Sequence, residues 1–396
     1  MEIFSDMTIL SLEQATTLPY LTYRLAQDGM NVIRLEHPIY GDPNRMIGEN
    51  YLKEERMNTY YLCINAGKKA ITLNLAEEKG KGLLQELITK LKVDIFATNQ
   101  LPKNYAKLSV DYETLKGIKP DIIWLGMSGF GPDSNEAAYE PILEARSGLM
   151  DLTGEAEGNP QSLGIPLADM GTSEHAYGLL MKALLRRERT GQGSRIDISM
   201  LESATSWLTV PITLTATFNQ KITRHGNTHE FFAPVSVFKT QNGYVYIAVG
   251  NDRQWKAMVD LSLFKSLEKP EYEKNEGRIR DVVNLNRSIG KIVSTVTSEK
   301  LIELFNQIRL PISKIHGIPE VLEDPLIKRR LIKSRDSVSG LELTLAPPPF
   351  VTSFLKNADN TMFFPPRFGE HNTEIYCNVL GYPESDLAMF KEKGVI

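Results

Sequence analysis

An aspartate at the predicted start of a helix is the residue best placed for covalent chemistry. Asp169 follows the mostly apolar segment 164–168 and precedes residues 172–189, whose apolar side chains recur at helical spacing. An aspartate in this place usually caps the helix, because its carboxylate accepts hydrogen bonds from free backbone N–H groups of the first turn. Alternatively, the carboxylate points into a ligand cleft and acts as a nucleophile. The residues alone favour the cap and leave the nucleophile open.

Glycines after a predicted strand form a second candidate. Gly129 and Gly131 would let a ligand or another backbone segment approach closely, although a simple turn explains them more readily. The chain lacks G-x-G-x-x-G, G-x-x-x-x-G-K-[ST] and G-x-S-x-G patterns, so the usual dinucleotide, P-loop and serine-hydrolase signatures are missing. Several cations near predicted strand ends could meet ligand phosphates, with solvated surface charge as the default interpretation: Arg34, Lys68, Lys69, Lys103 and Lys107.

The histidines and cysteines predict no metal site. The 6 histidines include no H-E-x-x-H motif, and only His225 and His229 have a spacing that resembles a ligand pair. Their segment reads as a loop. Cys63 and Cys377 are too few for a cysteine-rich zinc site and fit a reducing compartment.

Composition limits the kind of partner. Of 396 residues, 42% are hydrophobic and 24% are charged, as in an ordinary globular protein. Lys and Arg number 45 and Asp and Glu 49, and the net charge of −4 argues against a general nucleic-acid binder. No apolar run reaches about 18 residues, and the acidic N-terminus lacks a signal-peptide pattern. We therefore expect a cytoplasmic protein with a small-molecule substrate and no membrane or nucleic-acid partner.

The elements that must position Asp169 alternate between strands and helices. Strands are predicted at 7–10, 32–35, 69–73, 93–96, 121–125 and 195–199, and helices at 20–27, 77–91 and 172–189. This alternation predicts an α/β fold with a mostly parallel sheet and with ligands beyond the carboxyl ends of its strands. From about residue 220 to 320 the pattern changes to a clear strand at 243–249 and shorter helices, which indicates a second domain.

Short motifs in one order along nearly the whole chain match a known family. They include Arg-Leu-Glu-His-Pro at 34–38, Asn-Ala-Gly-Lys-Lys-Ala-Ile-Thr-Leu at 65–73, Ser-Gly-Phe-Gly at 128–131, Pro-Leu-Ala-Asp at 166–169, Arg-Thr-Gly-Gln-Gly at 189–193 and Pro-Pro-Arg-Phe-Gly-Glu-His-Asn-Thr at 365–373. The chain thereby resembles the class III (family III) CoA-transferases, the group that contains formyl-CoA and crotonobetainyl-CoA:carnitine transferases.

The resemblance implies a fold and a reaction. The fold is a Rossmann-like large domain (1–205 plus 330–396) with a smaller α+β domain (220–320), joined by linkers at about 205–220 and 320–345, in an interlocked dimer. In the reaction, Asp169 attacks an acyl-CoA to give an anhydride and then an aspartyl-CoA thioester, from which CoA passes to an acceptor acid. CoA is part of the substrate, and no tightly bound cofactor is expected. The donor and acceptor acids stay open.

Position by position, the resemblance also assigns site residues. Tyr139 would donate to an oxyanion and Glu140 would supply a second carboxylate, with a structural hydrogen-bonded pair as the alternative for both. The residues implied to contact CoA are Thr16, Thr17, His37, Leu73, Asn74, Leu75, Ala76, Asn99, Gln100, Leu101 and Lys107.

Departures from the family pattern bear on the substrate and on competing functions. Residues 228–234, Thr-His-Glu-Phe-Phe-Ala-Pro, replace a glycine-rich lid, which suggests an acid larger and less polar than oxalate or formate. The closest rival is an α-methylacyl-CoA racemase, but its catalytic histidine aligns with Tyr139, which is no base at neutral pH. A partner subunit of a hetero-oligomeric transferase is a further alternative, against which the presence of Asp169 argues.

Overall fold

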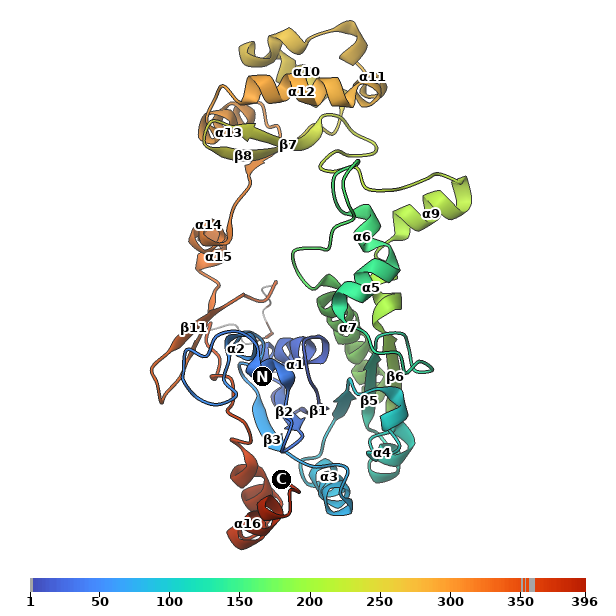
Figure 1. The fold of residues 1–396 in the computed structure, drawn as a ribbon, viewed down its shortest axis with the longest axis vertical. Coiled ribbons are helices and arrows are strands. Elements are labelled where there is room, and N and C mark those ends of the chain that lie inside the picture. The colour runs from blue at the N-terminus through green and yellow to red at the C-terminus, as the bar shows by residue number, and fades with distance from the viewer. Residues whose placement is uncertain (1–2, 350–351, 353, 356–359) are drawn as a thin grey trace. The chain divides into compact units, whose positions relative to one another are not determined.

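The computed structural model describes residues 3–349, 352, 354–355 and 360–396. The chain forms two compact units (Figure 1). The larger comprises Met1–Leu149, Ser162–Gln220 and Arg329–Ile396, and the smaller comprises Met150–Gln161 and Lys221–Lys328.

One segment lies in a different unit from the predicted one. The sequence-based boundaries put residues 150–161 in the large domain, but these residues belong to the smaller unit. Polar contacts of Arg224 explain the difference, because its Nη1 pairs with Asp151 Oδ1 at 3.1 Å and its Nε donates to the carbonyl of Gly158 at 2.8 Å. Both contacts join residues far apart in sequence, so no local pattern reports them.

A six-stranded parallel sheet forms the centre of the larger unit, in the order β3-β2-β1-β4-β5-β6 (Figure 1). This confirms the predicted α/β class and parallel sheet. The order reverses between β1 and β4, and the crevice beyond the carboxyl ends at such a point is where Rossmann-like sheets bind ligands. The strands are β1 (Thr8–Leu12), β2 (Asn31–Glu36), β3 (Lys69–Thr72), β4 (Ile95–Thr98), β5 (Ile123–Ser128) and β6 (Ser194–Ser199).

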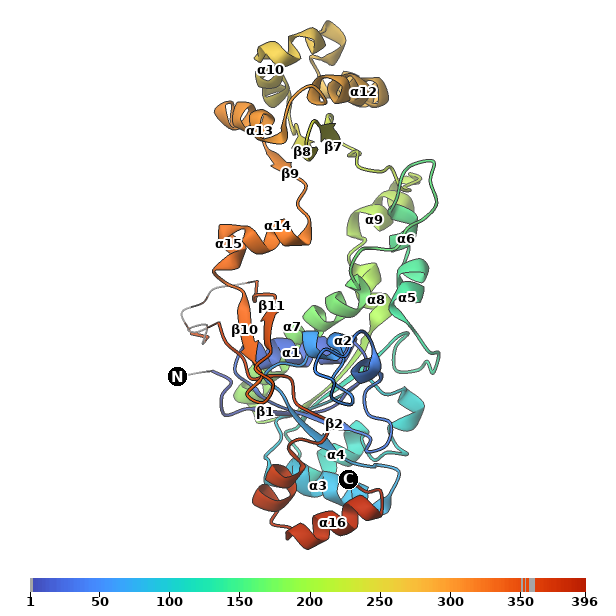
Figure 2. The same cartoon turned by 60° about the vertical axis from the view of Figure 1, so that its left-hand side comes forward.

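Helices cover both faces of this sheet (Figure 2). Side chains of α1 and α7 pack on one face, and those of α3, α4 and the C-terminal tail pack on the other. The helices are α1 (Thr17–Gln27), α2 (Thr59–Cys63), α3 (Glu78–Lys90), α4 (Tyr112–Ile118), α5 (Glu140–Ser147), α6 (Leu149–Leu152), α7 (Leu167–Thr190), α8 (Met200–Ser206), α9 (Thr209–Phe218) and α16 (Glu384–Glu392), with a π-helical segment at Thr373–Val379.

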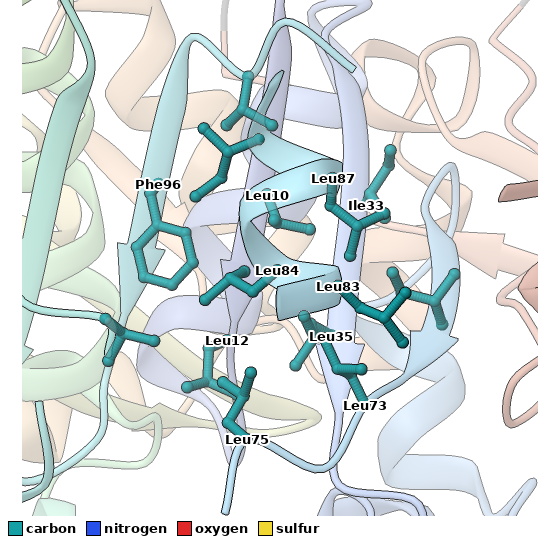
Figure 3. Close-up of a cluster of buried hydrophobic side chains, with 14 of the residues drawn as sticks. Leu10, Leu12, Ile33, Leu35, Leu73, Leu75, Leu83, Leu84, Leu87 and Phe96 are labelled. Atoms are coloured by element: carbon teal, nitrogen blue, oxygen red, sulfur yellow. The ribbon is translucent and has the colours of Figure 1, made fainter. Parts of the chain in front are cut away.

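Strand alternation divides the apolar residues between the two faces. On β1, Ile9 packs toward α1 and α7, whereas Leu10 packs toward α3. Figure 3 shows Leu83, Leu84 and Leu87 of α3 pointing at the strands. All three are buried, and each contributes about 1.5–3 kcal/mol to folding.

The smaller unit is an antiparallel sheet packed against short helices. Its strands β7 (Val235–Thr240), β8 (Gly243–Ala248) and β9 (Ile312–Lys314) pair in that order. Phe238, Val245 and Trp255 belong to its hydrophobic core. The helices of this unit include α10 (Asp252–Asp260), α11 (Asn275–Arg280), α12 (Val282–Val293) and α13 (Ser298–Gln307).

The two stretches expected as linkers carry regular structure. Residues 205–220 contain all of α9. Residues 320–345 contain part of α14 (Ile318–Glu323), α15 (Pro325–Lys328), and the hairpin of β10 (Ile332–Arg335) and β11 (Glu342–Leu345). Helix α9 is rich in Thr, Val and Ile, whose branched side chains have low helix propensity, so its sequence does not predict a helix.

Candidate active site

The loop after β1 leads directly to the candidate site. Ala15 has a left-handed φ of 61°, and side chains hold it from both sides: its N–H donates to Asp42 Oδ1 (3.1 Å), and Asn44 Nδ2 donates to its carbonyl (2.6 Å). Asn99, which follows β4, binds both backbone groups of Gln14 through its amide (3.2 and 2.8 Å). These contacts fix where Thr16 and Thr17 begin α1.

Asp169 lies beside this loop, in the first turn of α7. The residue is 9% exposed, and Thr17 Oγ1 donates to its Oδ1 at 2.5 Å. The second oxygen, Oδ2, has no hydrogen-bond partner among the residues that the structure describes. The helix-cap interpretation is wrong, because α7 already begins at Leu167 and the backbone N–H of Ala168 donates to Glu140 Oε1 instead (3.2 Å).

Packing between α1 and α7 keeps Thr17 against Asp169. Ser173, one turn along α7, donates through Oγ to the carbonyls of Thr17 (2.6 Å) and Asp169 (3.0 Å). Met200, at the start of α8, places its sulfur 3.7 Å from Thr17 Oγ1. The hydroxyl and the carboxylate are therefore oriented by groups on three helices.

Two opposing effects set the charge of Asp169. Burial raises the pKa of its carboxyl, and the hydrogen bond from Thr17 lowers it. Asp169 also lies in the first turn of α7, where the helix dipole favours negative charge. A shielded carboxylate with one uncommitted oxygen can act as a nucleophile.

Glu140 and Tyr139 occupy different environments. Glu140 is half-buried at the start of α5, close to Asp169; burial, the neighbouring Glu144 and the charge of Asp169 raise its pKa to about 7. The side chain of Tyr139 is 80% exposed, so the larger unit by itself does not bring its hydroxyl into a shielded site. Gly129 lets Ala138, two residues before Glu140, pack directly against the backbone after β5, because a Cβ at position 129 would lie 2.3 Å from Ala138 Cβ.

Buried ions between β1 and β2 were missed from the sequence. Arg34 and Arg45 are fully buried; Arg34 Nη2 lies 2.7 Å from Asp42 Oδ2, and Arg45 Nη2 lies 2.7 Å from Glu36 Oε2. The prediction that Arg34 could meet ligand phosphates is therefore wrong, because its buried guanidinium pairs with Asp42, the carboxylate that holds Ala15. A signal was present in the acidic Glu36 directly after the predicted strand at 32–35, but the partners of this carboxylate lie in other segments.

Lys68 is likewise buried and paired, so its proposed phosphate contact is also corrected. Its Nζ lies 3.0 Å from Glu13 Oε1 and donates to Asn65 Oδ1 at 2.8 Å. Burial lowers the pKa of Lys68 to about 8 despite the opposing charge of Glu13. Lys69, in contrast, is partly exposed and pairs with Glu374 at 2.6 Å.

The other residues implied to bind CoA follow the carboxyl ends of neighbouring strands. His37 follows β2, Asn74 follows β3, and Gln100 follows β4. His37 Nδ1 accepts hydrogen bonds from the N–H groups of Ile39 and Tyr40, which leaves Nε2 for a ligand. Burial lowers the pKa of this imidazole.

Several of these residues have committed or buried side chains. Leu73 and Leu75 belong to the hydrophobic core, so only their backbone groups are available to a ligand. The hydroxyl of Thr16 lies 2.9 Å from that of Tyr60. Ala76 and Lys107 are exposed, Leu101 is half-buried, and no contact joins these three to Asp169 in the described structure.

Two other kinds of feature, a metal-binding cluster and a membrane-spanning helix, are absent from the described residues. No group of three or more His, Cys, Asp and Glu side chains there is arranged to hold a metal ion. No helix of that part of the chain is long and apolar enough to cross a membrane.

Comparison with known proteins decides the family. The model of CoA-transferase family III matches residues 4–372. The chain belongs to this family. It is a CoA-transferase, and succinyl-CoA:glutarate CoA-transferase of Mus musculus is 29% identical to it over all of this chain and 91% of the mouse protein.

Other relatives of this CoA-transferase extend over a similar length. Formyl-CoA:oxalate CoA-transferase of Streptomyces avermitilis is 28% identical, with 98% of each chain covered. The crystal structure of a CAIB/BAIF family protein from Brucella suis superposes with a TM-score of 0.82, at 26% identity and over 94% of this chain and 98% of that one.

Proposed function

We propose that this enzyme transfers CoA from an acyl-CoA to a free carboxylic acid through a thioester on Asp169. The observation that carries the proposal is the shielded Asp169 carboxylate, with Oδ1 bound by Thr17 and Oδ2 uncommitted. The reaction is neither a redox step nor a hydrolysis, so it needs no tightly bound cofactor, and CoA enters as part of the substrate.

Each step balances without a proton donor. Asp169 Oδ2 attacks the thioester carbonyl, the C–S bond breaks, and CoA leaves as a thiolate while an acyl-aspartyl anhydride forms. The thiolate then attacks Cγ of Asp169 and releases the donor acid as its carboxylate. The acceptor carboxylate attacks the aspartyl-CoA thioester, and the thiolate returns to the acceptor's acyl carbon, which frees Asp169.

The surroundings of Asp169 fit these intermediates. Both are activated acyl groups that water would hydrolyse, and Asp169, a residue that is only 9% exposed, is partly protected from it. The hydrogen bond from Thr17 favours the ionised carboxylate that attack requires, since it opposes the effect of burial on the pKa of Asp169. We propose that residues after β1 to β4 bind CoA, namely Thr16, Thr17, His37, Leu73, Asn74, Leu75, Ala76, Asn99, Gln100, Leu101 and Lys107.

A half-reaction without acceptor tests this proposal. An enzyme with an aspartyl-CoA intermediate should release about one equivalent of donor acid per site when mixed with acyl-CoA alone. Succinyl-CoA is the first donor to use, because relatives carry succinyl-CoA in their names. Acid release measured by rapid quench should show this burst, and a panel of aliphatic, dicarboxylic and aromatic acids then identifies the acceptor. Absence of a burst with a donor that supports full turnover would contradict the covalent route.

We also propose that two copies of this chain pair through α9. This apolar helix has no buried residue, and Val210, Ile212 and Phe218 are all about half exposed. An apolar helix exposed on every side is unstable in water unless a partner covers it, and a second copy supplies an equally apolar surface.

A double substitution, Ile212→Asp with Phe218→Asp, should therefore shift the protein from dimer to monomer. The wild type should sediment as a dimer at micromolar concentration, because an obligate interface removes this apolar surface from water. Val283→Asp, at an exposed position of the smaller unit, is the control and should leave the sedimentation coefficient unchanged. A monomeric wild type, or a double variant that stays dimeric, would refute pairing through α9.

A further inference from the structure

Glu144 is a buried carboxylate that the proposed reaction does not use. It lies in α5, is fully buried, and accepts a hydrogen bond from the backbone N–H of Leu163 through Oε2 (3.2 Å). Its other oxygen, Oε1, is buried and has no hydrogen-bond partner in the described structure. Burying a carboxylate oxygen without a donor is costly, so a donor close to Oε1 would stabilise Glu144.

Glu140 is the neighbour that can supply this donor. It lies four residues earlier on α5, and residues at this spacing share one helix face. Glu140 Oε1 accepts from the N–H of Ala168, which leaves the second oxygen to carry a proton. Two ionised carboxylates side by side would repel each other, and one shared proton both removes that repulsion and supplies the donor.

The charges around Glu140 favour the same state. Burial raises the pKa of Glu140 to about 7, and the neighbouring Glu144 and the charge of Asp169 contribute to the shift. Glu140 and Glu144 lie on α5, which packs against α7 and α8. Asp169 is the charged group of α7 that contributes to the shift, and the charged residue of α8 is Glu202.

We propose that Glu140 and Glu144 share one proton, and that this neutral-acid and carboxylate pair is a positioning device for Asp169. The inference rests on Asp169 being the nucleophile. Glu140 acts through the N–H of Ala168, the residue before Asp169, so the pair fixes the first turn of α7. The shared proton also spares Asp169 a second negative charge nearby.

The proposal predicts how the rate depends on pH. As pH rises through about 7, Glu140 loses its proton, three carboxylates face one another, and the rate of transfer should fall. Glu140→Gln mimics the neutral acid, since its carbonyl can accept from Ala168 and its amide can donate to Glu144. This variant should lack the fall near pH 7 and turn over at least about tenfold faster than Glu140→Ala.

Glu144→Gln provides the second arm of the test. Without the Glu144 charge, Glu140 should release its proton at lower pH, so the fall in rate should move to lower pH than in the wild type. Glu136→Gln, an exposed position near α5, is the matched control and should keep the wild-type profile. A fall near pH 7 that is the same in wild type and Glu144→Gln would overturn the proposal.

Infrared titration reads the proton without turnover, so it separates this inference from the role of Asp169. The carbonyl stretch of one protonated carboxyl should be present at about pH 6 in the wild type, disappear above pH 7, and be absent from Glu140→Gln. The band should also persist in Asp169→Asn. Absence of the band in folded wild type would overturn the shared proton even if Asp169 proves to be the nucleophile.

Discussion

Asp169→Asn is expected to lower the rate of CoA transfer by at least about 10³-fold while leaving CoA binding within about threefold. The amide keeps the size of the side chain and can still accept the hydrogen bond from Thr17, but it is not a nucleophile at neutral pH. The loss should therefore appear in the chemical step, measured by rapid quench, and not in the dissociation constant of CoA, measured by calorimetry.

Asp6→Asn, an exposed position that makes the same chemical change, is the control and should transfer CoA at the wild-type rate. Asp169→Ala should be as slow as Asp169→Asn, since both lack the nucleophilic oxygen. Wild-type turnover in either Asp169 variant would refute the proposed mechanism.

Arg34→Met is expected to destabilise the larger unit by about 3–5 kcal/mol. Arg34 is fully buried, and its guanidinium lies 2.7 Å from Asp42 Oδ2 and 3.3 Å from Glu36 Oε1. Methionine fills the space of the aliphatic part but leaves two buried carboxylates without this counter-charge. The free energy of unfolding in urea, followed by circular dichroism, measures the loss.

The matched control is Arg195→Met, which breaks an exposed pair with Asp197 and should cost less than about 1 kcal/mol. Because Asp42 also holds the N–H of Ala15, Arg34→Met should slow transfer as well as weaken the fold. Equal losses of stability in the two variants would contradict the view that burial makes the Arg34 contacts strong.

The sheet could be predicted because its signals are local. Short apolar runs on β1 and β2 and helical spacing on α3 are visible in short windows, and each of these elements is found where it was expected. The parallel arrangement follows from helices that separate the strands. The family motifs around Asp169 added a functional interpretation that spacing alone could not supply.

The errors come from contacts between distant segments. Arg34 resembles a surface cation in the sequence, because its partners Asp42 and Glu36 are brought to it only by the fold. Asp169 resembles a helix cap in the sequence, because the carboxylate that does bind an N–H group at the start of α7 belongs to Glu140, 28 residues before Ala168. Polar burial of this kind depends on tertiary structure and leaves no periodic signal in the sequence.

Locating CoA on the protein tests most directly whether Asp169 is the nucleophile. The enzyme is mixed with acyl-CoA alone, quenched in acid, digested, and analysed by tandem mass spectrometry. We expect a peptide that carries one CoA as a thioester on Asp169, and loss of the adduct on treatment with hydroxylamine or acceptor acid. An adduct on a different residue, or turnover of the same donor with no covalent CoA formed, would contradict it.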